Sequence, residues 1–312
     1  EISLGLVGSE MCIRDSFDKG LFKSLFAYSA FIAINMIIDQ INWNIDKLVL
    51  ARFKGTTMVA VYSVGYSLYN YYMSFSTAIS GVFTPRIHKI VNETKESLVE
   101  QRKALTDLFT RVGRIQFLIL GLIASGVVFF GKPFILNIWA GEGYEDSYYV
   151  ALLIILPSSI ALIQNLGIEI QRAKNLHRFR SIAYLIMAVV NLILSIILCQ
   201  KYGAVGSAIG TAISLVVANG LIMNIYYHKK CEIDIISFWK SIVKQARGLI
   251  IPIITGIFIV KFVDLNSVPL FICSILVYTL IYCVSQWFIG MNAYEKNLIK
   301  SPINNILKKV KK

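Results

Sequence analysis

The chain has 312 residues, of which 56% are hydrophobic and 16% are charged, and its formal net charge is +13 at pH 7. A water-soluble domain could not bury this much Ile, Leu, Val and Phe, so the composition excludes an ordinary soluble protein. The positive charge could suggest a nucleic-acid partner, but the basic residues sit at the ends of apolar stretches and form no single groove. A lipid bilayer with anionic headgroups is the simpler partner, and no nucleic acid is expected.

Apolar stretches recur along almost the whole chain. A helix needs about 20 mostly apolar residues to cross a bilayer, and each stretch approaches or exceeds this length. The sequence therefore predicts an all-α fold, a polytopic membrane bundle of about eight transmembrane helices. The predicted spans are residues 21–45, 58–84, 112–131, 147–170, 181–200, 204–227, 247–263 and 269–290.

The basic residues favour alternate gaps between these spans. The entry segment, the second, fourth and sixth gaps and the tail hold 24 Lys and Arg residues, whereas the other gaps hold 6. Cytoplasmic loops carry an excess of Lys and Arg, so both termini are predicted to be cytoplasmic. The predicted outer gap at residues 141–146 is acidic, which agrees with this topology.

The first sixteen residues, EISLGLVGSEMCIRDS, differ from the rest. They show no membrane periodicity and resemble a translated sequencing adaptor, so we expect this segment to be non-native. A signal peptide is the alternative, but the segment has neither a basic start nor an apolar core of adequate length.

Catalytic and metal-binding patterns are not evident. The five Cys form no C-x-x-C pair, and the three His lie at predicted span ends, so no cofactor or metal is expected. We also find no nucleophile–base set and no phosphate-binding glycine loop. The sequence therefore predicts that the chain is not an enzyme.

The first span carries a polar stripe. Asn35, Asp39, Asn42 and Asp46 are spaced by four, three and four residues, which places them on one helical face. Such groups are costly in lipid, so they are predicted to line a substrate cavity. The alternative is a buried polar network that holds helices together.

The second span carries two neighbouring stripes, one polar and one aromatic. Tyr66 and Asn70 are the cavity candidates here, because aromatic rings stack on sugar faces and amides bind sugar hydroxyls. Interfacial tyrosines and close helix packing are the alternatives. The stripes consist of Ser63, Ser67, Asn70, Ser74 and Thr77, and of Tyr62, Tyr66, Tyr69 and Met73.

Two pairs of charged residues are candidates for a headgroup site or a gate. Arg111 and Arg114 lie one turn apart at the predicted cytoplasmic start of the third span, where two guanidinium groups could bind a diphosphate headgroup. Ordinary positive-inside anchoring is the alternative. Glu169 and Arg172 share a face and form either an intrahelical ion pair or a gate.

The later segments indicate architecture. The segment KYGAVGSAIGTAIS predicts a tight turn with small residues every fourth position, a pattern typical of close helix packing. Residues 229–312 are predicted to hold an amphipathic interfacial helix near 235–246, two peripheral membrane helices and a basic tail.

The order of these features resembles the second half of the polysaccharide flippases in the multidrug/oligosaccharidyl-lipid/polysaccharide exporter superfamily. The resemblance covers nearly all of residues 17–228. It rests on an Asp-basic pair at Asp46 and Lys47, on Gly55 before AVYSVGYS, and on the turn from Tyr202 to Thr211. The matching stretches are IDQINWNIDKLVLARFKGTTMVAVYSVGYSL, VFTPRI, and the run from KNLHRFRSIAYLIMAVVNLILSIIL to KYGAVGSAIGTAIS.

The resemblance implies a six-helix lobe at residues 17–228 whose facing first lobe is missing from this chain. It implies alternating-access transport of a lipid-linked oligosaccharide of undecaprenyl-diphosphate type across the bacterial inner membrane, for surface polysaccharide synthesis. A polysaccharide polymerase is a candidate partner. The alternatives are a cation-coupled multidrug exporter, a lipid II flippase, and a non-transporting scaffold of a glycan-assembly complex.

Overall fold

The computed structural model describes residues 19–20, 22–23, 26 and 44–310, without the side chains of residue 177 and residues 302–310. The chain divides into two compact units, residues 1–45 and 46–312. In the first unit the described residues are helical, and the rings of Phe22 and Phe26 stack with centroids 6.1 Å apart. Asn35, Asp39 and Asn42 lie outside the described residues, so the predictions made for them stay predictions.

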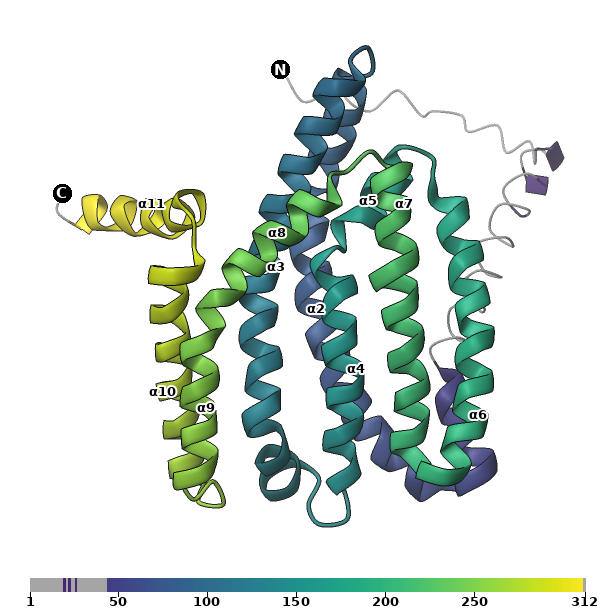
Figure 1. Cartoon of the computed structure of the whole chain (residues 1–312), viewed down its shortest axis with the longest axis vertical. Coiled ribbons are helices and arrows are strands. Elements are labelled where there is room, and N and C mark those ends of the chain that lie inside the picture. Colours follow the sequence, from purple (N-terminus) through teal and green to yellow (C-terminus); the bar gives the residue numbers. More distant parts are fainter. Residues whose placement is uncertain (1–18, 21, 24–25, 27–43, 311–312) are drawn as a thin grey trace, which may run out of the picture. The chain divides into compact units, whose positions relative to one another are not determined.

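The second unit begins with a hairpin of long helices (Figure 1). Residues 46–54 are helical and end at Gly55, whose φ of 84° lies in the left-handed region that favours glycine. The helices α2 (Thr56–Glu93) and α3 (Leu98–Pro133) follow, and Ser97 caps α3 by accepting from the amide of Glu100. A π-helix, η1 (Phe134–Trp139), leads to α4 (Glu145–Ile163) and the short α5 (Leu166–Ala173).

The next element, α6 (His177–Leu215), reverses direction within its own length. Gly203 has a φ of 57° and non-helical torsions, so α6 consists of two arms that pack against each other. The second arm continues through a π-helix, η2 (Val216–Ile222), into α7 (Met223–Lys229). The tight turn predicted at this position is confirmed.

The last elements leave the main bundle. The helix α8 (Ile235–Ala246) starts at the N-cap Asp234, crosses obliquely beside α3, and passes through η3 (Arg247–Leu249) into α9 (Ile250–Phe262). α10 (Val268–Ser285) returns beside α9 and ends in the π-helix η4 (Gln286–Gly290). The helix α11 (Ala293–Val310) then turns away from the axis of α10 (Figure 1).

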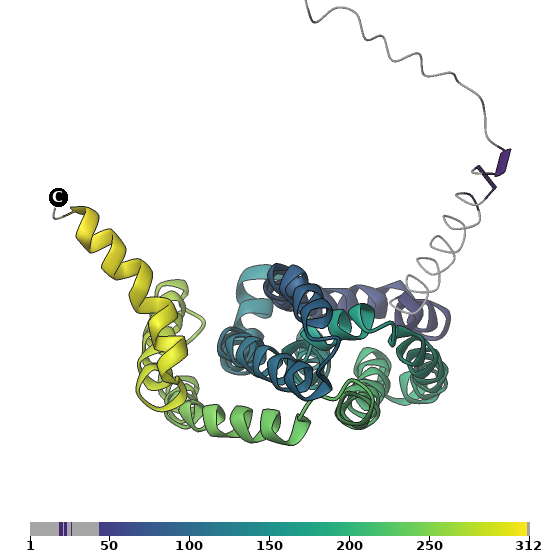
Figure 2. The same cartoon turned by 90° about the horizontal axis from the view of Figure 1, so that it is seen from above.

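The main core forms around α4, which has α2, α3 and α6 as its most extensive neighbours. Large side chains such as Tyr62, Tyr72, Phe109 and Ile154 are fully enclosed there. The pair α9–α10 lies at the edge, as the view from above shows (Figure 2). A smaller apolar cluster around Phe130 and Tyr278 joins this pair to α3, while many of its Ile, Leu and Phe side chains remain exposed.

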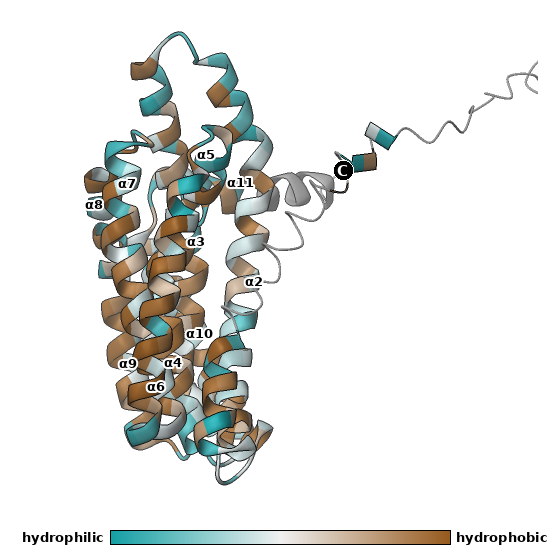
Figure 3. Cartoon of the chain, turned by 90° about the vertical axis from the view of Figure 1, so that its right-hand side faces the viewer, coloured by the Kyte–Doolittle hydropathy of each residue, from teal (hydrophilic) through white to brown (hydrophobic). Residues whose placement is uncertain are grey.

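Five helical stretches of the described residues are long and apolar enough to cross a membrane. They are Leu98–Trp139, Glu145–Ile163, Arg178–Lys229, Ile235–Phe262 and Val268–Gly290. The third of these contains the reversal at Gly203 and therefore two helical arms. The 38-residue α2 is not among them, because its polar stripe lowers its hydropathy (Figure 3). The fold is an all-α polytopic membrane bundle, as predicted.

Candidate functional site

The carboxylate of Asp46 lies at the centre of a buried hydroxyl cluster. Its Oδ2 accepts hydrogen bonds from Tyr62 Oη at 3.0 Å and Thr211 Oγ1 at 2.7 Å. Its Oδ1 accepts from Ser195 Oγ at 2.7 Å and Ser207 Oγ at 2.9 Å. We call these five residues the Asp46 cluster. It connects the helix at residues 46–54, α2 and both arms of α6.

The prediction that Asp46 lines an open cavity differs from the structure. The side chain is only 4% exposed, because four hydroxyl donors from neighbouring helices surround it. A buried carboxylate requires such partners, and among the described residues four hydroxyl hydrogen bonds supply them. Asp46 therefore follows the alternative prediction, a polar network that joins helices.

The small residues of the second α6 arm make this cluster possible. A side chain at Gly206 or Gly210 would collide with the first arm, at Leu198 and Ser195 respectively. The close packing of the two arms brings Ser207 close enough to bond Asp46. The predicted role of the small-residue pattern in helix packing is confirmed.

Three tyrosines of α2, Tyr62, Tyr66 and Tyr69, form a row of ring contacts that begins at the Asp46 cluster and that we call the tyrosine ladder. The ring centroids of Tyr62 and Tyr66 are 6.0 Å apart, and those of Tyr66 and Tyr69 are 5.4 Å apart. Lys47 Nζ lies 4.8 Å from the centre of the Tyr66 ring, a cation–π contact. Tyr66 is therefore largely covered, with 9% of its surface exposed.

Asn70 lies on the polar stripe of α2, beside the tyrosine ladder, and is exposed. Ser74 and Thr77 are exposed on the same stripe, and each donates its hydroxyl to a carbonyl of its own helix. A membrane helix satisfies hydroxyl groups in this way when no other helix provides a partner. This face of α2 is thus polar and uncovered within the second unit.

At the other end of the bundle, Arg180 of α6 lies against two tyrosines. Its guanidinium donates to Tyr184 Oη at 3.0 Å and to Tyr227 Oη at 3.4 Å, and its Cζ lies 4.3 Å from the Tyr184 ring centre. Tyr184 Oη in turn donates to Asn219 Oδ1 in η2. Sequence reasoning counted Arg180 only as a basic anchor. The spacing of four between Arg180 and Tyr184 is the signal that could have found this pair.

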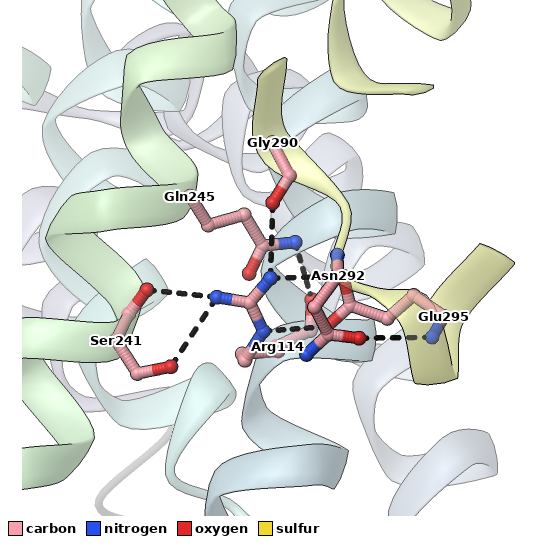
Figure 4. Close-up of polar contacts among 6 residues, drawn as sticks. All are labelled: Arg114, Ser241, Gln245, Gly290, Asn292 and Glu295. Atoms are coloured by element: carbon pink, nitrogen blue, oxygen red, sulfur yellow. Dashed lines mark hydrogen bonds and ion pairs between the residues drawn. The ribbon is translucent and has the colours of Figure 1, made fainter. Parts of the chain in front are cut away.

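Arg114 is not free to bind a headgroup, so that prediction is wrong. Figure 4 shows its guanidinium enclosed by Ser241, Gly290 and Glu295. Two of its nitrogens bind the two carboxylate oxygens of Glu295, and another donates to the Ser241 carbonyl at 2.9 Å. Arg114 and Glu295 are both about 95% buried, with 5% and 4% of their surfaces exposed. The N–H groups of the guanidinium that could bind a phosphate already bind a carboxylate of this chain.

Glu295 also organises the start of α11. Its Oε2 accepts from the amide of Asn292, and its own amide donates to Asn292 Oδ1 (Figure 4). This reciprocal pair is a capping box, which satisfies the first free amides of a helix. Arg114 therefore fixes the turn between α10 and α11.

The remaining candidates are Arg111, Glu169 and Arg172. Arg111 is exposed, and its guanidinium lies 5.0 Å from the Tyr294 ring centre. Arg172 Nη1 contacts Glu169 Oε1 at 2.6 Å within α5, so the predicted intrahelical ion pair is confirmed. Among the described residues, no group of three His, Cys, Asp or Glu is placed to hold a metal ion.

The fold and these polar networks define a polytopic membrane protein with one uncovered polar face. Residues 2–110 match the family described as polysaccharide biosynthesis protein. That match includes most of the first sixteen residues, whose expected non-native origin stays a prediction. No solved structure matches this chain.

Three curated relatives are similar to longer parts of the chain. A putative O-antigen transporter of Shigella flexneri is 25% identical over 216 residues, which are 68% of this chain and 48% of that protein. A probable low-salt glycan biosynthesis flippase of Haloferax volcanii is 26% identical over 211 residues, or 66% of this chain and 43% of the flippase. An uncharacterized membrane protein of Methanocaldococcus jannaschii is 23% identical over 303 residues, or 94% of this chain and 55% of that protein.

These matches confirm the resemblance to polysaccharide flippases that the sequence motifs indicate. The chain spans about half the length of the curated relatives it matches.

Proposed function

We propose that this chain is the second lobe of a flippase that carries a lipid-linked oligosaccharide across a bacterial inner membrane for surface polysaccharide synthesis. The observation that carries the proposal is the polar stripe of α2, on which Asn70, Ser74 and Thr77 are exposed. Polar groups on a membrane helix normally face a cavity or a protein partner, because lipid cannot satisfy them. A facing first lobe would supply the other wall of such a cavity.

The transport cycle we propose is alternating access. In such transporters one helix bundle rocks against another around a site near the middle of the membrane. The Asp46 cluster and the buried core around α4 hold helices of the second unit together, which supports the proposal that the unit rocks as a whole. The stripe of α2 would then face the substrate in both states.

The orientation we propose places both termini in the cytoplasm, from the distribution of 24 against 6 basic residues. α8 and α11 would then lie at the inner leaflet, where their Lys residues meet anionic headgroups. The substrate would be an undecaprenyl-diphosphate type glycan lipid, and the missing first lobe would be an obligatory partner. No step of this cycle makes or breaks a covalent bond, so we propose transport without enzymatic activity.

A cysteine-accessibility experiment tests the role of the α2 stripe. Single cysteines replace Asn70 or Ser74, and, as the matched control, Phe75, which is exposed on an apolar side of the same helix. The four native cysteines beyond the first sixteen residues, and Cys12, are first replaced by Ala. In membranes, a water-soluble methanethiosulfonate should label the Asn70→Cys and Ser74→Cys variants but not Phe75→Cys. Equal labelling of all three, or of none, would contradict a water-lined stripe.

A further inference from the structure

Arg180 lies against two tyrosines at one end of the bundle. It lies near the start of α6, at the end that the charge distribution predicts to be cytoplasmic. An arginine that anchors a helix end extends toward water. The guanidinium of Arg180 instead contacts the ring and hydroxyl of Tyr184, which follows it by one turn in α6.

The charge of Arg180 has no carboxylate partner among the described residues. Some other basic side chains of the unit do have one: Arg114 binds Glu295, Arg172 binds Glu169, and Lys174 binds Glu232. Within the described part of the chain, the guanidinium of Arg180 contacts the neutral hydroxyls of two tyrosines and the ring of one of them, Tyr184. A guanidinium has five N–H donors, so several of them remain available.

The surroundings of Arg180 hold its two hydroxyl partners in place. Tyr184 Oη is fixed by its hydrogen bond to Asn219, which lies in the π-helix η2. Tyr227 is buried, and Gly167 of α5 makes room for its ring, since any side chain there would collide with it. π-Helical turns are often found at functional sites. The guanidinium is therefore presented in a fixed orientation and is half-buried, with access from outside.

We propose that Arg180, supported by Tyr184 and Tyr227, binds a phosphate group of the lipid-linked substrate at the cytoplasmic end of the bundle. This inference rests on the proposed flippase function. A guanidinium fork matches phosphate oxygens with two parallel hydrogen bonds, and the partly desolvated site strengthens them. The tyrosine hydroxyls keep the fork oriented without neutralising its charge.

Binding of a soluble isoprenoid diphosphate tests the proposal. The purified chain is placed in phosphatidylcholine nanodiscs and titrated with radiolabelled farnesyl diphosphate, with farnesol as the uncharged competitor. The Arg180→Ala variant should bind farnesyl diphosphate about tenfold more weakly or worse, because it loses charge-assisted hydrogen bonds. Arg178→Ala is the matched control: Arg178 is exposed at the same helix start, and its removal should change the affinity less than about twofold.

Two further variants test the proposal in case the Arg180→Ala variant does not fold. Arg180→Lys keeps the charge but not the fork, so it should bind more weakly than the native chain. Tyr184→Phe keeps the ring under the guanidinium but removes a hydroxyl that orients it, so this variant should bind more weakly than the native chain and more tightly than Arg180→Ala. Equal affinity of Arg180→Lys and the native chain, or equal effects of Arg180→Ala and Arg178→Ala, would overturn the proposal.

A second titration distinguishes the two possible sources of the phosphate, the substrate and bilayer phospholipid. The titration is repeated in nanodiscs enriched in phosphatidylglycerol. Unchanged binding of farnesyl diphosphate supports a site for the substrate, whereas its loss assigns the site to bilayer phospholipid and overturns the substrate assignment. Neither titration requires translocation. Failure to bind farnesyl diphosphate therefore leaves the cysteine-accessibility test of the flippase function unaffected.

Discussion

Arg114 of α3 and Glu295 of α11 form a buried bidentate ion pair between residues 181 positions apart in the sequence. The pair lies where α3, α8, η4 and α11 meet (Figure 4). It connects the main bundle to the peripheral α9–α10 pair and the terminal helix. Arg114 therefore contributes to the position of α11, together with the contact between Arg111 and Tyr294.

Replacing Glu295 with Gln should destabilise the chain strongly. The guanidinium of Arg114 would remain buried without a counter-charge, which costs about 3–5 kcal/mol. The measurement is the free energy of unfolding in mixed micelles. The control is Glu93→Gln, which removes the exposed ion pair with Lys89 and should cost about 1 kcal/mol or less. A similar small effect for both variants would show that the buried pair contributes little.

Replacing Asp46 with Ala should weaken the packing of α2 against the two arms of α6 and lower the free energy of unfolding. Four hydroxyl groups would lose their acceptor, and groups left unsatisfied in this way cost about 1–3 kcal/mol. Asp264, an exposed aspartate in the loop between α9 and α10, provides the control variant Asp264→Ala. The unfolding free energies of both variants check this prediction, which fails if the two are equal.

Replacing Gly206 with Ala should destabilise α6, because its new methyl group would collide with the backbone of the first arm at Leu198. Overpacking of this kind costs about 1–3 kcal/mol. The control is Gly81→Ala in α2, where no atom lies within 4 Å of the new methyl group. Because alanine is a better helix former, Gly81→Ala should stabilise the chain by up to about 1 kcal/mol. The midpoint temperatures of thermal unfolding should therefore shift in opposite directions for the two variants, relative to the native chain.

Asp234, the N-cap of α8, should make part of the stability depend on pH. The hydroxyl and backbone amide of Ser237 donate to its carboxylate and hold its pKa below the ordinary value. Since the folded-state pKa is depressed, the contribution is present above the unfolded pKa of about 3.9 and is lost as the pH falls through the folded-state pKa. Asp234→Ala should cost about 1 kcal/mol at neutral pH and remove this dependence.

Unfolding curves of the native chain and of Asp234→Ala between neutral and acidic pH provide the measurement. Asp107, exposed on α3, supplies the control variant Asp107→Ala, which should follow the native pH profile. A constant difference between native chain and Asp234→Ala down to the lowest pH would contradict the capping role.

The predicted topology can be tested by labelling from outside intact cells. In a chain without its native cysteines, a cysteine at Lys309 should resist an impermeant maleimide, because the tail is predicted to be cytoplasmic. A cysteine at Glu142, in the predicted outer gap, should react. The reverse pattern would overturn the orientation.

The sequence predicted those features that depend on local periodicity. The turn at Gly203, the amphipathic α8 and the Glu169–Arg172 pair each arise from residues close together in the chain. Hydropathy and small-residue spacing are sufficient signals for such elements.

The partners of buried charges could not be predicted in the same way. Asp46 bonds residues that follow it by 149 to 165 positions, and the partner of Arg114 lies in the last helix. A periodic pattern reports which face of a helix is polar, but not which distant helix covers that face. For this reason Asp46 and Arg114 were both predicted to be available to substrate, and both are enclosed.

Complementation of a strain that lacks its own polysaccharide flippase tests the central claim most directly. Residues 17–312 are expressed alone or together with a first six-helix lobe, and surface glycan is scored. A cavity between two lobes needs both walls, so the chain alone should give no surface glycan, and co-expression of the first lobe should restore it. Full rescue by residues 17–312 alone would contradict the account.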